Sequence, residues 1–219
     1  MSRHTDVWLV RHPQTDWNRA RRYQSRSDRP LTALGEAQAR ALAHRLRRLS
    51  FAAIVTSGQR RCDAVVELVA AQQPGRGHLL RDARWREADH GAWEGLTARE
   101  VLARFPAQAQ ARWGDPWRSR AHGGESGADV WTRVQAACAQ LLRDFDGGRV
   151  LIVTHATPIQ LLLCALLGLP FERSWQWRID TGSLTNLDLY PSGAIVRTIN
   201  SLPSLRSVEH EPRSNHCDD

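Results

Sequence analysis

The stretch from residue 7 to residue 15 reads VWLVRHPQT, and the predicted fold is built around it. Val7–Val10 is apolar, which is typical of a buried strand, and it ends directly before Arg11 and His12. This pattern places two polar side chains at the carboxyl end of the predicted strand.

Two further segments repeat the pattern. Val150–Thr154 is strongly apolar and is followed by His155, and Phe51–Thr56 is followed by Ser57. In open α/β sheets, ligands bind at the carboxyl ends of the strands. We therefore expect the polar groups that follow these strands to converge in one pocket.

Segments with the helical period of apolar residues alternate with these strands. The predicted helices are Thr32–Leu49, Arg60–Gln72, Thr97–Phe105, Ser126–Phe145 and Pro158–Leu167. Thr32 is suited to cap the first of them, and Pro74 and Gly75 are expected to end the second. Helices that alternate with strands indicate βαβ units.

The end of the chain has a different pattern. Ser183–Tyr190 and Ala194–Ile199 flank a turn at residues 191–193, which predicts an antiparallel hairpin. Leu79 and Leu80 indicate one more short strand. Together these patterns predict an α/β fold, a three-layer α/β/α sandwich with a mostly parallel central sheet and an antiparallel edge.

The chain has 219 residues, of which 42% are hydrophobic and 24% charged, as in ordinary globular proteins. This length predicts a single domain over residues 1–200 and a polar, flexible tail over residues 201–219. No apolar run approaches the roughly 20 residues that a membrane span needs. Residues 1–6 lack the core of a signal peptide, so we expect a cytoplasmic location and no membrane partner.

Basic residues outnumber acidic residues by 30 to 23, and every basic residue is an arginine. A basic protein favours anionic partners, which are nucleic acids or small phosphorylated molecules. One cluster consists of Arg19, Arg21, Arg22, Arg26 and Arg29. Because we expect this loop to overhang the pocket, attraction of a phosphorylated substrate is the simpler account, and no nucleic-acid partner is expected.

The residues at the strand ends form a dense cationic set. Arg11, His12 and His155 are joined by Arg60 or Arg61. The natural ligand of such a set is a phosphoryl group, because the arginine fork binds phosphate bidentately. A neutral imidazole can attack phosphorus and form a phosphohistidine, and nearby arginines lower its pKa and keep it neutral.

A carboxylic acid is also needed to protonate the leaving alkoxide and then to deprotonate water. Glu87 is the candidate, in competition with Asp89 and Glu94. No HExxH, DxD or GxxxxGK motif is present, and the four cysteines lack metal-site spacing. These residues favour a phosphomonoesterase that needs no metal and no cofactor.

Six ordered elements resemble the histidine phosphatase superfamily, which includes the cofactor-dependent phosphoglycerate mutases and the acid-type phosphatases. The first three are Leu9–Thr15 together with Trp17 and Asn18, then Ser27–Thr32, and then Ser57–Arg61. The fourth is Glu87 together with Gly91, Trp93, Glu94 and Gly95. The fifth is Asp115 and Pro116 together with Gly123–Ser126, and the sixth is Val153–His155 before a helix. The resemblance covers residues 7–189 and implies the phosphoglycerate mutase-like fold.

The resemblance also implies a role for each matching residue. His12 is the nucleophile, and Glu87 is the general acid and base. Arg11, Arg61 (in preference to Arg60) and His155 clamp the phosphoryl oxygens.

Asn18, Gln24 and Ser25 are the candidate substrate-binding residues. Pro13 stands where the family usually has glycine, and it fixes φ and removes an N–H beside the nucleophile. Ala156 and Thr157 replace a usual pair of glycines. These departures leave the substrate open among sugar phosphates, phosphoglycerates, a cobalamin-pathway phosphate and protein phosphohistidine, which relatives handle.

The leading hypothesis is therefore a phosphatase that acts on a small phosphorylated metabolite. A phosphoglycerate mutase activity would use the same residues, but mutases usually carry a longer insertion between the glutamate and the GGES segment. A third hypothesis is a non-catalytic, arginine-rich RNA-binding or regulatory protein on this scaffold. A homodimer is compatible with each hypothesis.

Overall fold

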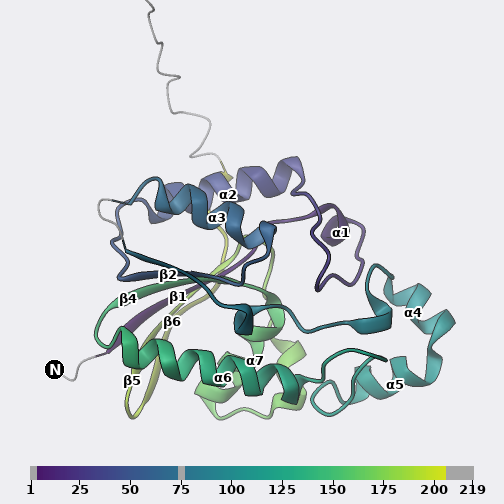
Figure 1. The fold of residues 1–219 in the computed structure, drawn as a ribbon. Helices are drawn as coiled ribbons and strands as arrows, with labels where there is room; N and C mark the ends of the chain where they lie inside the picture. Colours follow the sequence, from purple (N-terminus) through teal and green to yellow (C-terminus); the bar gives the residue numbers. More distant parts are fainter. Residues whose placement is uncertain (1–3, 74–76, 206–219) are drawn as a thin grey trace, which may run out of the picture.

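The computed structural model describes residues 4–73 and 77–205. Six strands form one sheet in the order β3-β2-β4-β1-β5-β6 (Figure 1). The strands are β1 (Thr5–Arg11), β2 (Ala53–Thr56), β3 (His78–Arg81), β4 (Arg149–Thr154), β5 (Leu184–Tyr190) and β6 (Gly193–Ser201). The first four are mutually parallel, and β5 and β6 add the predicted antiparallel edge. The predicted α/β class is confirmed.

The two central strands bring the histidine segments side by side. β1 pairs in parallel with β4, and in this register Arg11 lies opposite Thr154. His12 and His155 are the next residue along each strand, and the His12 amide donates to the Thr154 carbonyl (2.9 Å). Two positions far apart in the sequence thus become neighbours through backbone pairing alone.

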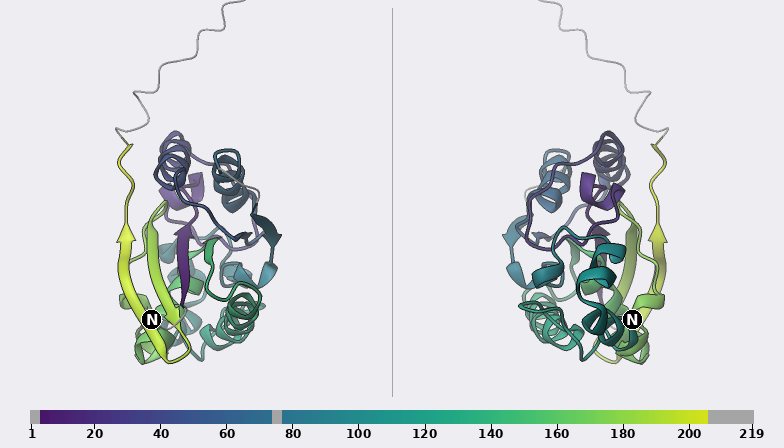
Figure 2. Two further views of the ribbon diagram at one scale, coloured as in Figure 1. Left: turned by 90° about the vertical axis from the view of Figure 1, so that its left-hand side faces the viewer. Right: turned by 90° about the vertical axis from the view of Figure 1, so that its right-hand side faces the viewer.

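Two pairs of helices cover the two faces of the sheet (Figure 2). α2 (Ala33–Leu46) and α3 (Arg60–Ala70) pack on one face, and α6 (Gly127–Asp144) and α7 (Ala156–Leu167) pack on the other. Leu9 belongs to the core under α6 and α7, whereas Val10 belongs to the core under α2 and α3. Because successive strand residues point to opposite faces, a strand buried on both sides is apolar throughout.

Side chains at the predicted positions start the helices. The Thr32 hydroxyl accepts the Gly35 amide (3.0 Å) at the start of α2. Ser126 and Asp129 form a capping box at the start of α6. The predicted end of α3 at Pro74 and Gly75 lies outside the described residues, as do residues 206–219 of the predicted tail.

Several short elements beside the sheet were not expected. They are α1 (Asp16–Arg19), α5 (Pro106–Gly114), η1 (Ala83–Trp85), η2 (Gly91–Trp93) and η3 (Phe171–Gln176), in addition to the expected α4 (Ala98–Arg104). Pro106 ends α4 as predicted, but it also occupies the first turn of α5, where its missing N–H costs nothing. α4 and α5 lie to one side of the sheet around a small core of their own, which contains Trp93 and Val101.

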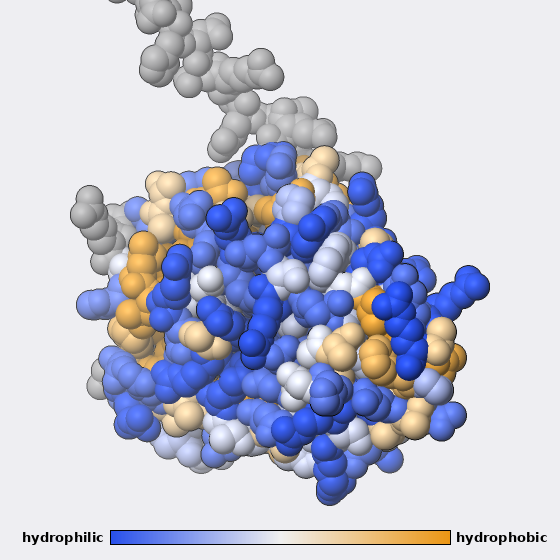
Figure 3. Space-filling view, turned by 45° about the vertical axis from the view of Figure 1, so that its right-hand side comes forward, coloured by the Kyte–Doolittle hydropathy of each residue, from blue (hydrophilic) through white to orange (hydrophobic). Residues whose placement is uncertain are grey.

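Hydrophilic residues cover most of the face drawn in Figure 3. Within the described part of the chain, no helix combines the length and the apolar character that crossing a bilayer requires.

Candidate active site

The two histidines at the carboxyl ends of β1 and β4 face each other. Their ring centroids are 5.0 Å apart, and the rings are inclined by 56°. His12 is 3% exposed and His155 is fully buried. The predicted convergence of these two strand ends is therefore present in the structure.

His12 is held as a neutral imidazole with a defined tautomer. Its Nδ1 lies 2.8 Å from the Pro13 carbonyl, which can only accept, so the proton resides on Nδ1 and Nε2 carries the lone pair. Burial, followed by the charges of Arg61 and Arg11, lowers the His12 pKa well below 6.5. Pro13 lacks an N–H, as the sequence indicates, but its carbonyl orients the ring.

His155 has the opposite tautomer. Arg61 Nη2 donates toward His155 Nδ1 (3.4 Å), so the proton is on Nε2, which lies 2.9 Å from the Ser57 hydroxyl. Burial and the charges of Arg61, His12 and Arg11 lower its pKa well below the ordinary value. Both histidines are neutral in this arrangement, so the positive charge of the site is carried by arginine.

Arg11 and Arg61 are the charged groups beside the histidine pair. Arg61 is 1% exposed and donates to the carbonyls of Ser25 (2.8 Å) and Ser27 (3.1 Å). Arg11 donates through Nη1 to the Ile179 carbonyl. Burial lowers the pKa of both guanidinium groups, although arginine remains charged at any physiological pH.

Neither of these arginines forms an ion pair with a carboxylate of the described residues, and the Nε–H of each is buried without an acceptor. Buried donors are nearly always satisfied, and a buried charge normally has a counterion. An anion bound between the two guanidinium groups would supply both the missing hydrogen-bond acceptors and the missing counterion. Arg60, the alternative to Arg61, is instead 87% exposed at its side chain and lies 3.8 Å from Asp28.

Glu87 is fixed by backbone amides. Its Oε1 accepts from the amides of Ala88 (2.9 Å) and Thr157 (3.2 Å), so the start of α7 holds the carboxylate. The two rival carboxylates have other partners. Asp89 forms an ion pair with Arg26, and Glu94 accepts from the Ser25 hydroxyl and from the amides of Ser25 and Ser27.

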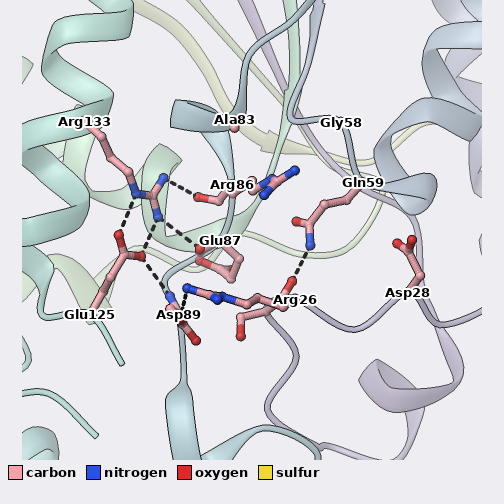
Figure 4. Close-up of a pocket in the computed structure, with 11 residues that line it drawn as sticks. Arg26, Asp28, Gly58, Gln59, Ala83, Arg86, Glu87, Asp89, Glu125 and Arg133 are labelled. Carbon is pink, nitrogen blue, oxygen red and sulfur yellow. Dashed lines mark hydrogen bonds and ion pairs between the residues drawn. The ribbon is translucent and has the colours of Figure 1, made fainter. Parts of the chain in front are cut away.

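A pocket of about 410 Å³ opens beside Glu87 (Figure 4). Its lining consists of Ser25, Arg26, Asp28, Gly58, Gln59, Ala83, Arg86, Glu87, Asp89, Glu125 and Arg133. Most of these side chains are polar or charged, and the pocket is large enough for the leaving group of a small ester.

The three residues proposed to bind substrate differ in their surroundings. Asn18 accepts from the Thr15 amide (3.0 Å) in the capping box of α1, and Gln24 is buried against the Thr15 hydroxyl (2.7 Å). Ser25 lines the pocket, although its hydroxyl is bonded to Glu94 and accepts the His90 amide (3.1 Å). The geometry thus places Ser25 at the pocket and gives Asn18 and Gln24 structural partners.

Arg133 of α6 was not among the predicted site residues. It donates to the carbonyls of Arg84 (2.7 Å), Arg86 (2.7 Å) and Glu87 (3.0 Å), and it forms a bidentate pair with Glu125. Burial alone would raise the Glu125 pKa, but hydrogen bonds from Arg133 and the Asp89 amide lower it overall. This network fixes the backbone of residues 84–87 and thereby the position of Glu87.

The only indication in the sequence is Glu125 itself, which lies within the Gly123–Ser126 element of the family resemblance. Within residues 4–73 and 77–205, moreover, no group of three or more His, Cys, Asp or Glu side chains is arranged to hold a metal ion.

Comparisons with known proteins show the family of this chain. The sequence profile of the histidine phosphatase superfamily (branch 1) matches residues 7–202. The chain is 28% identical over 193 residues to phosphoserine phosphatase 1 of Hydrogenobacter thermophilus, covering 88% of this chain and 90% of that protein. It is 33% identical over 186 residues to a probable phosphoglycerate mutase, GpmB, of an Enterobacter species, covering 85% and 86% of the two chains.

The fold has close counterparts among solved structures. The Bacillus stearothermophilus protein YhfR superposes with a TM-score of 0.84 at 30% identity, over 92% of this chain and 99% of that one.

Proposed function

The chain belongs to the histidine phosphatase superfamily and is an enzyme of the phosphatase type, and from this we propose that it hydrolyses a small phosphorylated metabolite through a phosphohistidine on His12. One observation carries the proposal. The unprotonated Nε2 of a buried, neutral His12 lies in a site with the buried Arg61 and the partly buried Arg11, neither of which has a carboxylate counterion among the described residues.

The first half-reaction transfers the phosphoryl group to the enzyme. The Nε2 lone pair attacks phosphorus, an N–P bond forms and the P–O ester bond breaks. Glu87 gives its proton to the leaving oxygen, so an alcohol departs and a carboxylate remains. Arg11 and Arg61 offset the charge that develops on the phosphoryl oxygens, which is the main requirement of phosphoryl transfer.

The second half-reaction returns the enzyme to its starting state. The Glu87 carboxylate takes a proton from water, the water oxygen attacks phosphorus and the N–P bond breaks. Inorganic phosphate leaves, and His12 regains its lone pair. The Pro13 carbonyl keeps the proton on Nδ1 throughout, so Nε2 does not change tautomer.

Hydrolysis of p-nitrophenyl phosphate in EDTA tests the proposal, with wild type beside His12→Asn. We expect turnover in EDTA and a loss of about 10³-fold or more in the variant, because the amide nitrogen of asparagine is not a nucleophile. His44→Asn, a substitution on α2 away from the pocket, is the matched control. The wild type should also yield an acid-labile, alkali-stable phosphoenzyme. Turnover that survives in His12→Asn would refute the nucleophile assignment.

The mutase alternative is favoured by the GpmB relatives and uses the same residues. Incubation with 3-phosphoglycerate separates the two activities: release of inorganic phosphate without 2-phosphoglycerate supports the phosphatase. The RNA-binding alternative predicts salt-sensitive RNA binding and no turnover. The small phosphorylated partner, the homodimer and the cytoplasmic location stay predictions.

A further inference from the structure

We propose that Arg86 makes this pocket selective for monoesters whose leaving group carries its own carboxylate close to the ester oxygen. The ligand class is a short phosphorylated hydroxy acid. This inference rests on the proposed phosphatase activity and adds the kind of leaving group that the pocket accepts.

The charges that line the pocket are almost all paired. Arg26 forms an ion pair with Asp89, and Arg133 forms one with Glu125 (2.8 Å). Asp28 lies 3.8 Å from Arg60. Arg86 and Glu87 are the lining residues outside these ion pairs, and Glu87 must hold a proton when it acts as the acid. At that moment the only uncompensated charge among the described lining residues is the Arg86 guanidinium.

Arg86 is exposed to the pocket with most of its donors free. Its one hydrogen bond to a described residue runs from Nε to the Ser57 carbonyl (3.4 Å), and no carboxylate of the described chain pairs with it. In Figure 4 its guanidinium extends toward Gly58 and Gln59, away from the pairs that Arg26 and Arg133 form. A guanidinium fork of this kind binds a carboxylate bidentately.

The position of Arg86 limits the length of the leaving group. It is the residue before Glu87, and Arg133 holds the carbonyls of both residues (2.7 and 3.0 Å). The backbone that carries the general acid therefore also carries the unpaired cation. Since Arg86 and Glu87 line the same pocket, an anion bound by Arg86 and the ester oxygen protonated by Glu87 fit one small leaving group.

The lining argues against a heterocyclic leaving group. None of the described residues that line the pocket is aromatic, so the lining offers a nucleobase or a benzimidazole no aromatic ring to stack on. A short polar acid suits this pocket better than a nucleoside.

The test compares kcat/KM for 3-phosphoglycerate and glycerol 3-phosphate, which differ by a carboxylate in place of a hydroxymethyl group. We expect the wild type to prefer 3-phosphoglycerate by about 10- to 100-fold, the range for a hydrogen-bonded charge pair. Arg86→Gln should bring the ratio close to one, and Arg86→Lys should retain part of it. Because both substrates undergo the same phosphoryl chemistry, the ratio reports on the leaving group alone.

Arg48→Gln is the matched control, because it removes the same charge from an exposed position at the end of α2, outside the pocket lining, and should keep the wild-type ratio. Three results for the ratio of kcat/KM values would overturn the proposal. They are a wild-type ratio near one, a ratio that is unchanged in Arg86→Gln, and a ratio that is lost in Arg26→Gln instead. Faster hydrolysis of a ribonucleoside 5′-monophosphate than of 3-phosphoglycerate would also overturn the proposal, as would failure to hydrolyse either glyceryl ester while p-nitrophenyl phosphate is turned over. Absence of p-nitrophenyl phosphate turnover would count against the phosphatase activity itself.

Discussion

His12 and Glu87 are oriented by main-chain groups. The Pro13 carbonyl fixes the imidazole of His12, and the amides of Ala88 and Thr157 hold the carboxylate of Glu87. Main-chain groups are present whatever the side chain, which explains how Pro13 and Thr157 can stand where relatives usually have glycine. The carbonyl and the amide that the site needs remain in place.

Replacing Glu87, the proposed general acid, should lower the rate more for an ester with a poor leaving group than for an ester with a good one. For Glu87→Gln we expect kcat on an alkyl phosphate to fall by about 10²–10⁴-fold, the usual contribution of general acid–base catalysis. The first half-reaction of p-nitrophenyl phosphate should suffer much less, because p-nitrophenolate leaves without a proton. Burst kinetics with both esters measure this step. Glu94→Gln is the control carboxylate, and an equal loss with both esters in Glu87→Gln would contradict the assignment.

The histidine tautomers can be observed directly. Because burial and the two arginines hold the pKa of His12 and His155 well below 6.5, both rings should stay neutral from pH 8 to below pH 6.5. Long-range ¹H–¹⁵N spectra of the imidazoles should show the proton on Nδ1 of His12 and on Nε2 of His155. A ring that titrates near pH 6.5, or two rings with the same tautomer, would contradict this arrangement.

At the scale of elements, α6 controls the geometry of the acid through Arg133. We expect Arg133→Met to lower kcat by about 10²-fold, because a displacement of roughly 1 Å at a catalytic group has that effect. A positioning role predicts that the loss depends on the leaving group in the same way as in Glu87→Gln. Arg133→Lys should rescue only part of the activity, since one ammonium cannot reach all the acceptors. An equal loss with alkyl and p-nitrophenyl esters would indicate general destabilisation instead.

The sequence pattern predicted the long elements because their periodicity is local. The strands β1, β2 and β4 and the helices α2, α3, α6 and α7 carry apolar residues at the spacing that their burial requires. α5 was missed because Pro106 marks both the end of one helix and the start of the next. The four-residue α1 is too short to show a period.

The difference between local sequence patterns and contacts between distant segments also explains which site residues could be predicted. His12 and His155 follow buried strands, so the sheet determines their positions. The role of Arg133 depends on a contact between α6 and the segment 84–87, which no local pattern reveals. Asn18 and Gln24 have the polar character of ligand-binding residues, but their bonds to Thr15 form part of the loop.

At the scale of the whole molecule, keeping histidines neutral in the interior reduces acid stability. His12, His90 and His155 all have pKa values lowered chiefly by burial, so below pH 6.5 the unfolded chain binds protons that the folded chain does not. Stability is therefore retained above pH 6.5 and lost as the pH falls below it. Each histidine contributes at most about 1.4 kcal/mol per pH unit, the limit reached where it is protonated in the unfolded chain and neutral in the folded chain.

Urea denaturation at pH 7.5, 6.5 and 5.5 measures this effect in a range where most carboxylates remain ionised. The free energy of unfolding should fall between pH 6.5 and 5.5, and the decrease should be smaller in His12→Asn, which removes one of the three groups. A flat profile in the wild type over this range would show that these rings are protonated in the folded protein.

The pairing of β1 with β4 also bears on how the enzyme responds to heat. The proposed nucleophile His12 and its partner His155 follow the two innermost strands, whereas Arg86 is an exposed residue on the segment that connects η1 to η2 beside the sheet. Connecting segments that bind ligands generally open at lower free-energy cost than core strands. As the temperature rises, discrimination between substrates should therefore decline before hydrolysis itself does, and turnover should persist until the sheet melts. Parallel measurement of the 3-phosphoglycerate preference and of sheet content during a thermal ramp would show the order of these losses.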